Sequence, residues 1–145
     1  MDLSCIRNDL YDRKIIGWAY GKNITAELAT QAVKNACLNI PDTTGIVLHS
    51  DLGSQYTSEE FEKYLQDQGM LHSFSRKGNP YDNDCIESFH SILKKEEVYT
   101  TTYYTFEESK SALFEYIESF YNRKRRHNAL DYKTPQQVED EVLAA

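Results

Sequence analysis

The sequence lacks the features that would place it in a membrane or in a secreted, repetitive or multidomain protein. It has no run of about 20 apolar residues, the length that crosses a bilayer, and residues 1–13 contain no apolar stretch typical of a signal peptide. It also has no repeat, low-complexity tract or Pro/Gly-rich linker. We therefore expect one domain over residues 1–145, in the cytoplasm and without membrane contact.

Cysteine is scarce, and its spacing argues against a disulfide framework or a structural zinc site. The three cysteines lie far apart, with no C-x-x-C pair: Cys5, Cys37 and Cys85. The four histidines show no zinc-finger spacing: His49, His72, His90 and His127. We interpret the cysteines as small buried side chains in a reducing compartment.

Basic residues are outnumbered, and the formal net charge of −7 argues mildly against a nucleic-acid partner, because phosphate binding depends on Lys and Arg. The charges are unevenly spread, however. Acidic residues crowd 59–67 and 139–141, whereas basic residues crowd 123–126, with smaller groups at 76–77 and 94–95. Local patches matter more than the total charge.

Apolar residues make up 40% of the sequence, and their spacing predicts strands that alternate with helices. The expected strands are 3–7, 14–20, 46–50 and 70–74. Helices are expected at 26–37, from 57 to a stop at Gly69, from Asp82 or Asn83 to about Val98, and twice within 105–143. This order favours an α/β layered domain.

Capping residues mark the expected helix starts. Thr25 can cap the first helix, and the spacing of a capping box occurs at Thr57–Glu60 and Thr105–Glu108. Thr134–Gln137 is a further start signal, with Pro135 at the favoured first position. One apolar stripe is expected after Thr105: Leu113, Tyr116, Ile117, Phe120 and Tyr121.

Two carboxylates are placed where a metal could bind. Asp51 follows the strand that ends near Ser50, and the carboxyl ends of strands commonly face the ligand crevice of α/β folds. Glu87 lies in the first turns of a helix, with 35 residues between it and Asp51. Carboxylates from different elements suit Mg²⁺. Taken singly, Asp51 is also a good turn former, and Glu87 also suits the helix dipole.

Basic residues lie close to both carboxylates in the sequence. Lys94 is two turns after Glu87 on the same helix face, and the Arg76–Lys77 loop falls between the two carboxylates. These cations can contact an anionic phosphate, although Lys94 also fits a solvated helix face.

Several longer motifs occur in order along nearly the whole chain: D-L-Y-D-R-K-I-I-G-W at 9–18, H-S-D-L-G-S-Q-Y at 49–56, S-R-K-G-N-P-Y-D-N at 75–83, E-S-F-H-S-I-L-K at 87–94, Y-N-R-K-R-R-H-N-A-L at 121–130 and T-P at 134–135. In this order the motifs resemble the OrfB transposases of bacterial insertion sequences. The resemblance implies the ribonuclease-H-like fold of retroviral integrase catalytic cores, a mixed sheet flanked by helices.

The resemblance also implies roles for single residues. The family uses an Asp, Asp, Glu triad to hold two Mg²⁺ (or Mn²⁺) ions, with 35 residues between the second Asp and the Glu, as between Asp51 and Glu87. Lys94 matches a basic residue that contacts DNA near the active site. DNA contact is also expected at the other basic residues: Arg76, Lys77, Arg123, Lys124, Arg125 and Arg126. For the run at 123–126, the alternative is a solvated helix end.

No residue matches the first Asp of the triad. In the family this Asp lies on a first strand before the hairpin, and this sequence begins at the hairpin. Asp2 aligns with the second strand, and Asp9 and Asp12 align with turn positions that are not ligands. Because the first strand is central in the fold, its absence predicts an altered sheet or a dimer, since unpaired edges invite association.

Three functions follow from the resemblance. The first is transposition, in which a DDE transposase core cleaves a phosphodiester and transfers the strand; its partners are transposon ends and target DNA, and it acts as a homo-oligomer without a small-molecule cofactor. The second is a truncated, catalytically inert remnant that self-associates or binds DNA without cutting it. The third is a nuclease of the same fold that cuts without joining.

Overall fold

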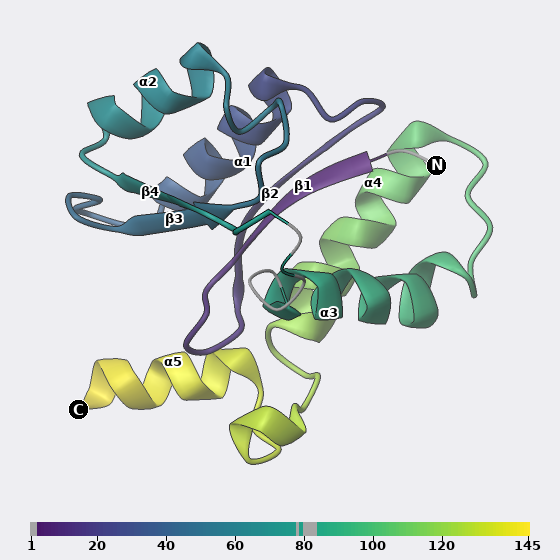
Figure 1. Ribbon diagram of the computed structural model, residues 1–145. Helices are drawn as coiled ribbons and strands as arrows, with labels where there is room; N and C mark the ends of the chain where they lie inside the picture. The colour runs from purple at the N-terminus through teal and green to yellow at the C-terminus, as the bar shows by residue number, and fades with distance from the viewer. Residues whose placement is uncertain (1–2, 78, 80–83) are drawn as a thin grey trace. The chain divides into compact units, whose positions relative to one another are not determined.

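The computed structural model describes residues 3–77, 79 and 84–145, with only the backbone for 3–8 and 84. Its strands are β1 (Leu3–Asn8), β2 (Ile15–Gly21), β3 (Val47–Ser50) and β4 (Leu71–Phe74). Its α-helices are α1 (Ala26–Cys37), α2 (Glu59–Asp67), α3 (Asp84–Leu93), α4 (Phe106–Phe114) and α5 (Pro135–Ala144) (Figure 1). Wider π-helical segments continue α3 as η2 (Lys94–Val98) and α4 as η3 (Glu115–Tyr121), and η4 (Asn128–Leu130) is a short 3-10 helix.

The chain forms two compact units. The first comprises Met1–Arg7 and Gly17–Asp84, and the second comprises Asn8–Ile16 and Cys85–Ala145. The chain therefore passes from one unit to the other within β2. That the two units form one domain remains a prediction.

The core of the first unit lies where two helices meet the strand β3. Figure 1 shows α1 and α2 on one side of β3 and β4. The buried apolar cluster comes from β2, α1, β3 and α2: Ala19, Ala29, Ala32, Val33, Leu48, Phe61 and Leu65. The helix α1 packs closely against β2 at Gly17. A Cβ added at Gly17 would lie 2.5 Å from the Cβ of Ala36 on α1, so a side chain at this position would collide with the helix.

The described strands form two separate two-stranded sheets, β1 with β2 and β3 with β4. β3 and β4 are parallel, with Leu48 opposite His72 and Ser50 opposite Phe74. Parallel strands need a crossover connection, and α2 provides it. Among the described residues no strand joins the two sheets; the altered sheet and the dimer stay predictions.

The second unit is built on aromatic packing between α3 and η3. Phe89 of α3 meets Tyr121 edge to face, with ring centroids 4.8 Å apart, an arrangement that aromatic pairs favour. The buried apolar side chains of this unit are Ile15, Phe89, Leu93, Leu113, Tyr116, Ile117 and Tyr121. Phe120 was expected in this stripe but is 41% exposed, because the π-helical turn is wider than an α-turn and shifts the helical phase.

Most of the expected helix starts are confirmed. Thr25 and Thr105 accept the predicted backbone N–H groups, and Thr134 with Gln137 forms a complete capping box. Glu108 instead accepts the N–H of Tyr104, so the second expected box is only half formed. The expected starts at Asp82 or Asn83 lie outside the described residues.

The capping box expected at Thr57–Glu60 is wrong by one residue. Ser58 is the N-cap of α2, and its hydroxyl accepts the N–H of Phe61. Thr57 instead belongs to the preceding turn, in which its N–H donates to the carbonyl of Gly53. The predicted stop is confirmed, since Gly69 follows α2 in the left-handed region with φ +70°.

Candidate active site

Asp51 directly follows β3 and is exposed. Its Oδ1 accepts the N–H of Gly53 at 2.7 Å, which closes a short turn at the strand end. Oδ2 has no hydrogen-bond partner within the described part of the chain. The carboxylate is therefore held through one oxygen and free to bind a cation through the other.

The turn after Asp51 explains the glycine in the H-S-D-L-G-S-Q-Y segment. A Cβ added at Gly53 would lie 2.8 Å from Asp51 Oδ1 and 2.8 Å from Gln55 Nε2. The carbonyl of Gly53 also accepts the N–H groups of Tyr56 and Thr57. Only a residue without a side chain lets the backbone approach the carboxylate this closely.

A chain of polar side chains supports the end of β3 from within the first unit. Ser50 is buried, and its hydroxyl donates to the carbonyl of Asp51 at 2.9 Å. The same hydroxyl contacts Nε2 of His72 at 2.8 Å, and Nδ1 of His72 pairs with the carboxylate of Glu62 on α2. Sequence reasoning missed His72 and Glu62, because the parallel register between β3 and β4 places His72 and the packing of α2 places Glu62.

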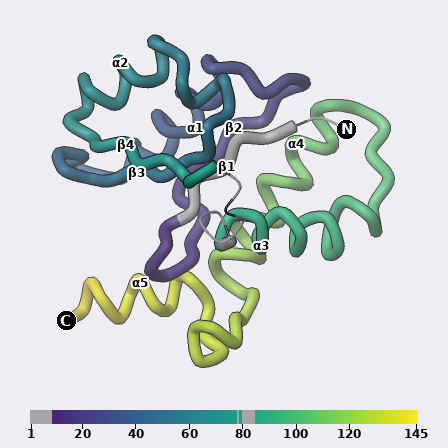
Figure 2. The backbone as a smooth tube through the Cα atoms, viewed as in Figure 1, coloured from purple at the N-terminus to yellow at the C-terminus, as the bar shows by residue number. Residues whose placement is uncertain are grey.

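Glu87 lies on the exposed face of α3 in the second unit. Ser91 and Lys94, one and two turns further on, are exposed as well, whereas Phe89 and Leu93 are buried. The trace in Figure 2 shows the coil of α3 running on into η2. Glu87 and Lys94 are thus both exposed, and their shared face stays a prediction.

His90, three residues after Glu87, is only partly exposed. Burial lowers the pKa of its imidazole, and the neighbouring Lys94 lowers the pKa further. His90 is therefore neutral at pH 7, and the positive charge beside Glu87 comes from Lys94.

The expected cations of the first unit, Arg76 and Lys77, are exposed just after β4. The preceding residue is fixed, since Ser75 donates its N–H to the carbonyl of Ser50 at 2.8 Å. The carbonyl of Arg76 accepts the N–H of Asn79 at 3.2 Å. The loop bearing these cations thus begins beside the residue that precedes Asp51.

The basic run after η3 lies in a turn in which the carbonyl of Phe120 accepts the N–H groups of Lys124 and Arg125. Three of its side chains are exposed: Arg123, Lys124 and Arg126. Arg125 differs, because its guanidinium pairs with the carboxylate of Glu96 on η2, with Nη2 to Oε1 at 2.9 Å.

The environment of Glu96 favours its charged form. Burial alone would raise the pKa of Glu96, but hydrogen bonds from Arg125 and from the Tyr116 hydroxyl outweigh burial and lower the pKa. The Tyr116 hydroxyl donates to Oε2 at 2.6 Å, and the pKa of Tyr116 is raised, first by burial and then by this bond. Arg125 is therefore a structural cation in this unit.

His127 closes the basic run without adding charge. Burial, and then the nearby Arg125, lower the pKa of His127 to about 4. Its Nε2 is buried with no hydrogen-bond partner in the described part of the chain. The available positive charge of the run thus comes from its three exposed side chains.

Asp51 belongs to the first unit and Glu87 to the second, and the structure defines the surroundings of each within its own unit. Within residues 3–77, 79 and 84–145, no three His, Cys, Asp or Glu side chains come together as a metal site. The helices of these residues include none that is long and apolar enough to cross a bilayer.

Strands alternating with helices and a parallel β3–α2–β4 unit define an α/β core, with an acidic residue at the end of β3. A family model described as "Integrase core domain" matches residues 5–80, and a second model of that description matches residues 68–135. The chain belongs to the integrase core domain family.

Relatives of this family in bacteria are transposases. The chain is 40% identical, over 90% of its length, to the transposase for insertion sequence element IS904 of Lactococcus lactis, of which it covers 52%. It is 36% identical, over 94% of its length, to transposase InsF for insertion sequence IS3A of Escherichia coli, of which it covers 47%. The chain thus spans about half the length of these curated relatives.

A solved structure shows the same fold. A chain in the cryo-EM structure of the simian T-cell lymphotropic virus intasome, in complex with PP2A regulatory subunit B56 gamma, aligns with a TM-score of 0.63. The alignment covers 92% of this chain and 51% of that chain, at 18% identity. The expected integrase-like fold and the expected superfamily of DDE transposase cores are confirmed.

Proposed function

We propose that this chain is the catalytic-core part of a DNA transposase, which cleaves DNA phosphodiesters and transfers the cut strand. The observation that carries the proposal is the carboxylate of Asp51, exposed at the end of β3 with one oxygen fixed by Gly53. It stands in a chain whose family model is the integrase core domain and whose relatives are transposases.

In this proposal Asp51 and Glu87 hold Mg²⁺ or Mn²⁺. Both side chains are exposed and offer carboxylate oxygens, the ligands that these hard cations prefer. Two such ions, when bound, activate the attacking oxygen and stabilise the leaving oxygen of an in-line displacement. The chain's own part is to orient the carboxylates, through the turn at Gly53 for Asp51 and through the helix α3 for Glu87.

DNA is the proposed substrate, held by exposed cations along its phosphates. We assign this role to Lys94 and to five further side chains: Arg76, Lys77, Arg123, Lys124 and Arg126. Arg125 would first have to exchange the carboxylate of Glu96 for a phosphate, so we expect a smaller contribution from it. We further propose that the active species is a homo-oligomer, which light scattering of the chain with and without DNA tests.

A second candidate is a remnant of such a core that folds and binds DNA without cutting it. One observation favours it within the described residues: the strands form two separate sheets. In this case Asp51 and Glu87 would not belong to a complete metal site.

Calorimetric titration with Mn²⁺ separates the two candidates. The chain is compared with Asp51→Asn and Glu87→Gln, and with Asp42→Asn as a matched control. Asp42 is also an exposed Asp in a short turn, where its Oδ1 accepts the N–H of Thr44 at 2.9 Å. The core proposal expects saturable binding that both site variants lose and the control keeps. A chain that binds no Mn²⁺, or loses binding equally in the control, supports the remnant.

A further inference from the structure

His72 is an imidazole enclosed between a sheet and a helix. In the parallel register it lies opposite Leu48, so that both side chains face α2. Its ring meets Phe61 of α2 edge to face, with centroids 5.6 Å apart. The side chain of His72 is only 6% exposed, and hydrogen bonds must therefore come from the protein for both ring nitrogens.

The two ring nitrogens connect α2 to the end of β3. Nδ1 pairs with the carboxylate of Glu62, and Nε2 lies 2.8 Å from the hydroxyl of Ser50. That hydroxyl carries one hydrogen, which it donates to the carbonyl of Asp51 at 2.9 Å. The oxygen of the same hydroxyl can accept from Nε2 of His72 while its hydrogen goes to Asp51.

We propose that Glu62, His72 and Ser50 are positioning residues for Asp51. The inference rests on the proposed metal-binding role of Asp51. The carboxylate is exposed and follows a strand of only four residues, so its position depends on the peptide group from which it projects. The bond from Ser50 fixes the carbonyl of that peptide group, and the bond from Gly53 fixes the carboxylate. A ligand must be held to within about 0.5 Å to serve catalysis, and the two bonds act on the two ends of this residue.

The same sheet offers a built-in comparison. His49 also bridges β3 and β4, through Nδ1 to the hydroxyl of Ser73 at 3.0 Å and Nε2 to that of Ser75 at 2.9 Å. It lies on the opposite face of the strands, because it pairs in register with Ser73. Neither Ser73 nor Ser75 forms a hydrogen bond to Asp51 in the described part of the chain. If imidazole bridges served only to join the strands, the loss of His49 and the loss of His72 would have similar effects at Asp51.

The test measures backbone order at the strand end in solution. Amide order parameters of residues 51–53 are recorded by NMR relaxation for the chain and for three variants: Ser50→Ala, Glu62→Gln and His72→Phe. His72→Phe keeps an aromatic ring beside Phe61. Glu62→Gln changes a partly exposed side chain and is the milder variant if a buried substitution prevents folding. We expect a fall from about 0.85 to below about 0.6. The variants Ser50→Thr, which retains the hydroxyl, and His49→Asn should keep the higher value.

Metal affinity gives the second measurement. Where the parent chain binds Mn²⁺, the same three variants should bind it about tenfold more weakly, the scale of one lost hydrogen bond, whereas Ser50→Thr and His49→Asn should not. A parent chain that binds no Mn²⁺ refutes the proposed metal site, yet its order parameters still test the positioning. Unchanged order at 51–53 in Ser50→Ala and Glu62→Gln, or an equal fall in His49→Asn, overturns the inference.

Discussion

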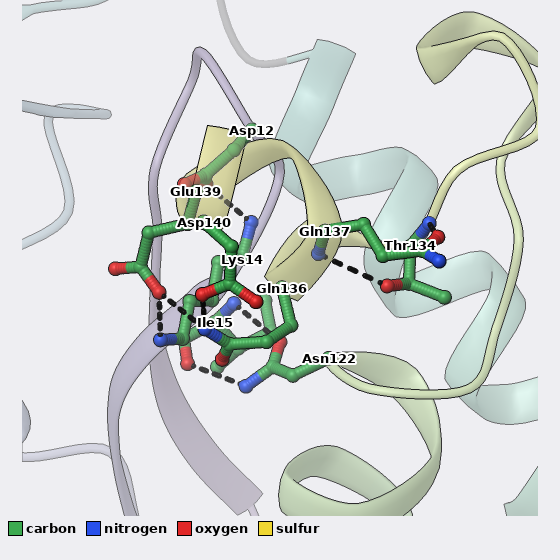
Figure 3. A network of polar contacts seen from close by, with 9 residues as sticks. All are labelled: Asp12, Lys14, Ile15, Asn122, Thr134, Gln136, Gln137, Glu139 and Asp140. Atoms are coloured by element: carbon green, nitrogen blue, oxygen red, sulfur yellow. Dashed lines mark hydrogen bonds and ion pairs between the residues drawn. The ribbon is translucent and has the colours of Figure 1, made fainter. Parts of the chain in front are cut away.

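Asn122 joins two parts of the second unit that are far apart in the sequence, and its truncation should be strongly destabilising. The side chain is 1% exposed. Its Oδ1 accepts the N–H of Ile15 at 2.8 Å, and its Nδ2 donates to the carbonyl of Ile15 at 3.0 Å (Figure 3). The carbonyl of Asn122 also accepts the N–H of Gln136 on α5, at 2.8 Å. One amide thus pairs with the start of β2 as a neighbouring strand would.

The magnitude follows from the groups left behind in Asn122→Ala. Ile15 is 2% exposed, so water cannot easily replace either lost bond. A buried donor or acceptor without a partner costs about 1–3 kcal/mol, and two such groups give about 3 kcal/mol after partial relaxation. At roughly 2–4 °C per kcal/mol for a chain of this size, the melting temperature should fall by roughly 6–12 °C. The backbone bond to Gln136 is unaffected.

Urea unfolding followed by circular dichroism measures the loss, and Asn128→Ala is the matched control. Asn128 is exposed in the same unit, and such substitutions usually change stability by less than about 0.5 kcal/mol. A loss below about 1 kcal/mol in Asn122→Ala would show that the backbone of Ile15 finds other partners. The reasoning would then be wrong.

Three further predictions concern DNA, acid and the turn at Asp51. Arg123→Ala should reduce the slope of log affinity against log salt by about 1 in a DNA-binding titration, and Arg125→Ala should reduce it less, because Arg125 is already paired. The pKa of His127 is lowered from 6.5 to about 4, so between these pH values the unfolded chain binds a proton that the folded chain does not. Stability should therefore fall as the pH decreases from 6.5 to 4, and His127→Gln should flatten this dependence in urea titrations. Gly53→Ala should weaken Mn²⁺ binding in calorimetry, because the added Cβ displaces the carboxylate of Asp51. Equal slopes, an unchanged pH profile or unchanged affinity would contradict these predictions in turn.

The local structure of the first unit could largely be predicted from the sequence. The helix α1 has the predicted bounds, since Thr25 supplies the cap and alanines at helical spacing supply the buried face. The stop at Gly69 follows from its freedom in the left-handed region. The cap of α2 could not be predicted in the same way, because Thr57 and Ser58 are both capable caps and the turn from Gly53 decides between them.

Contacts between residues far apart in the sequence could not be predicted from sequence spacing. The bond between Asn122 and Ile15 joins residues 107 positions apart, and the contact between His72 and Ser50 depends on the register of two parallel strands. Neither is a local property of the chain. The candidate ligands Asp51 and Glu87 were found because they stand at element ends, where the position in the chain predicts the position in the fold.

Charge shows most clearly how the folded chain changes the meaning of a sequence pattern. The run from 123 to 127 contains five basic residues, which suggests a dense phosphate-binding patch. In the structure the burial of His127 favours its neutral form, and Glu96 neutralises Arg125. Each phosphate neutralised by a cation contributes about 0.9 to the salt slope on duplex DNA. Three exposed cations can therefore contribute at most about 2.7, and a larger slope would require Lys94 or the Arg76–Lys77 loop to bind the same DNA.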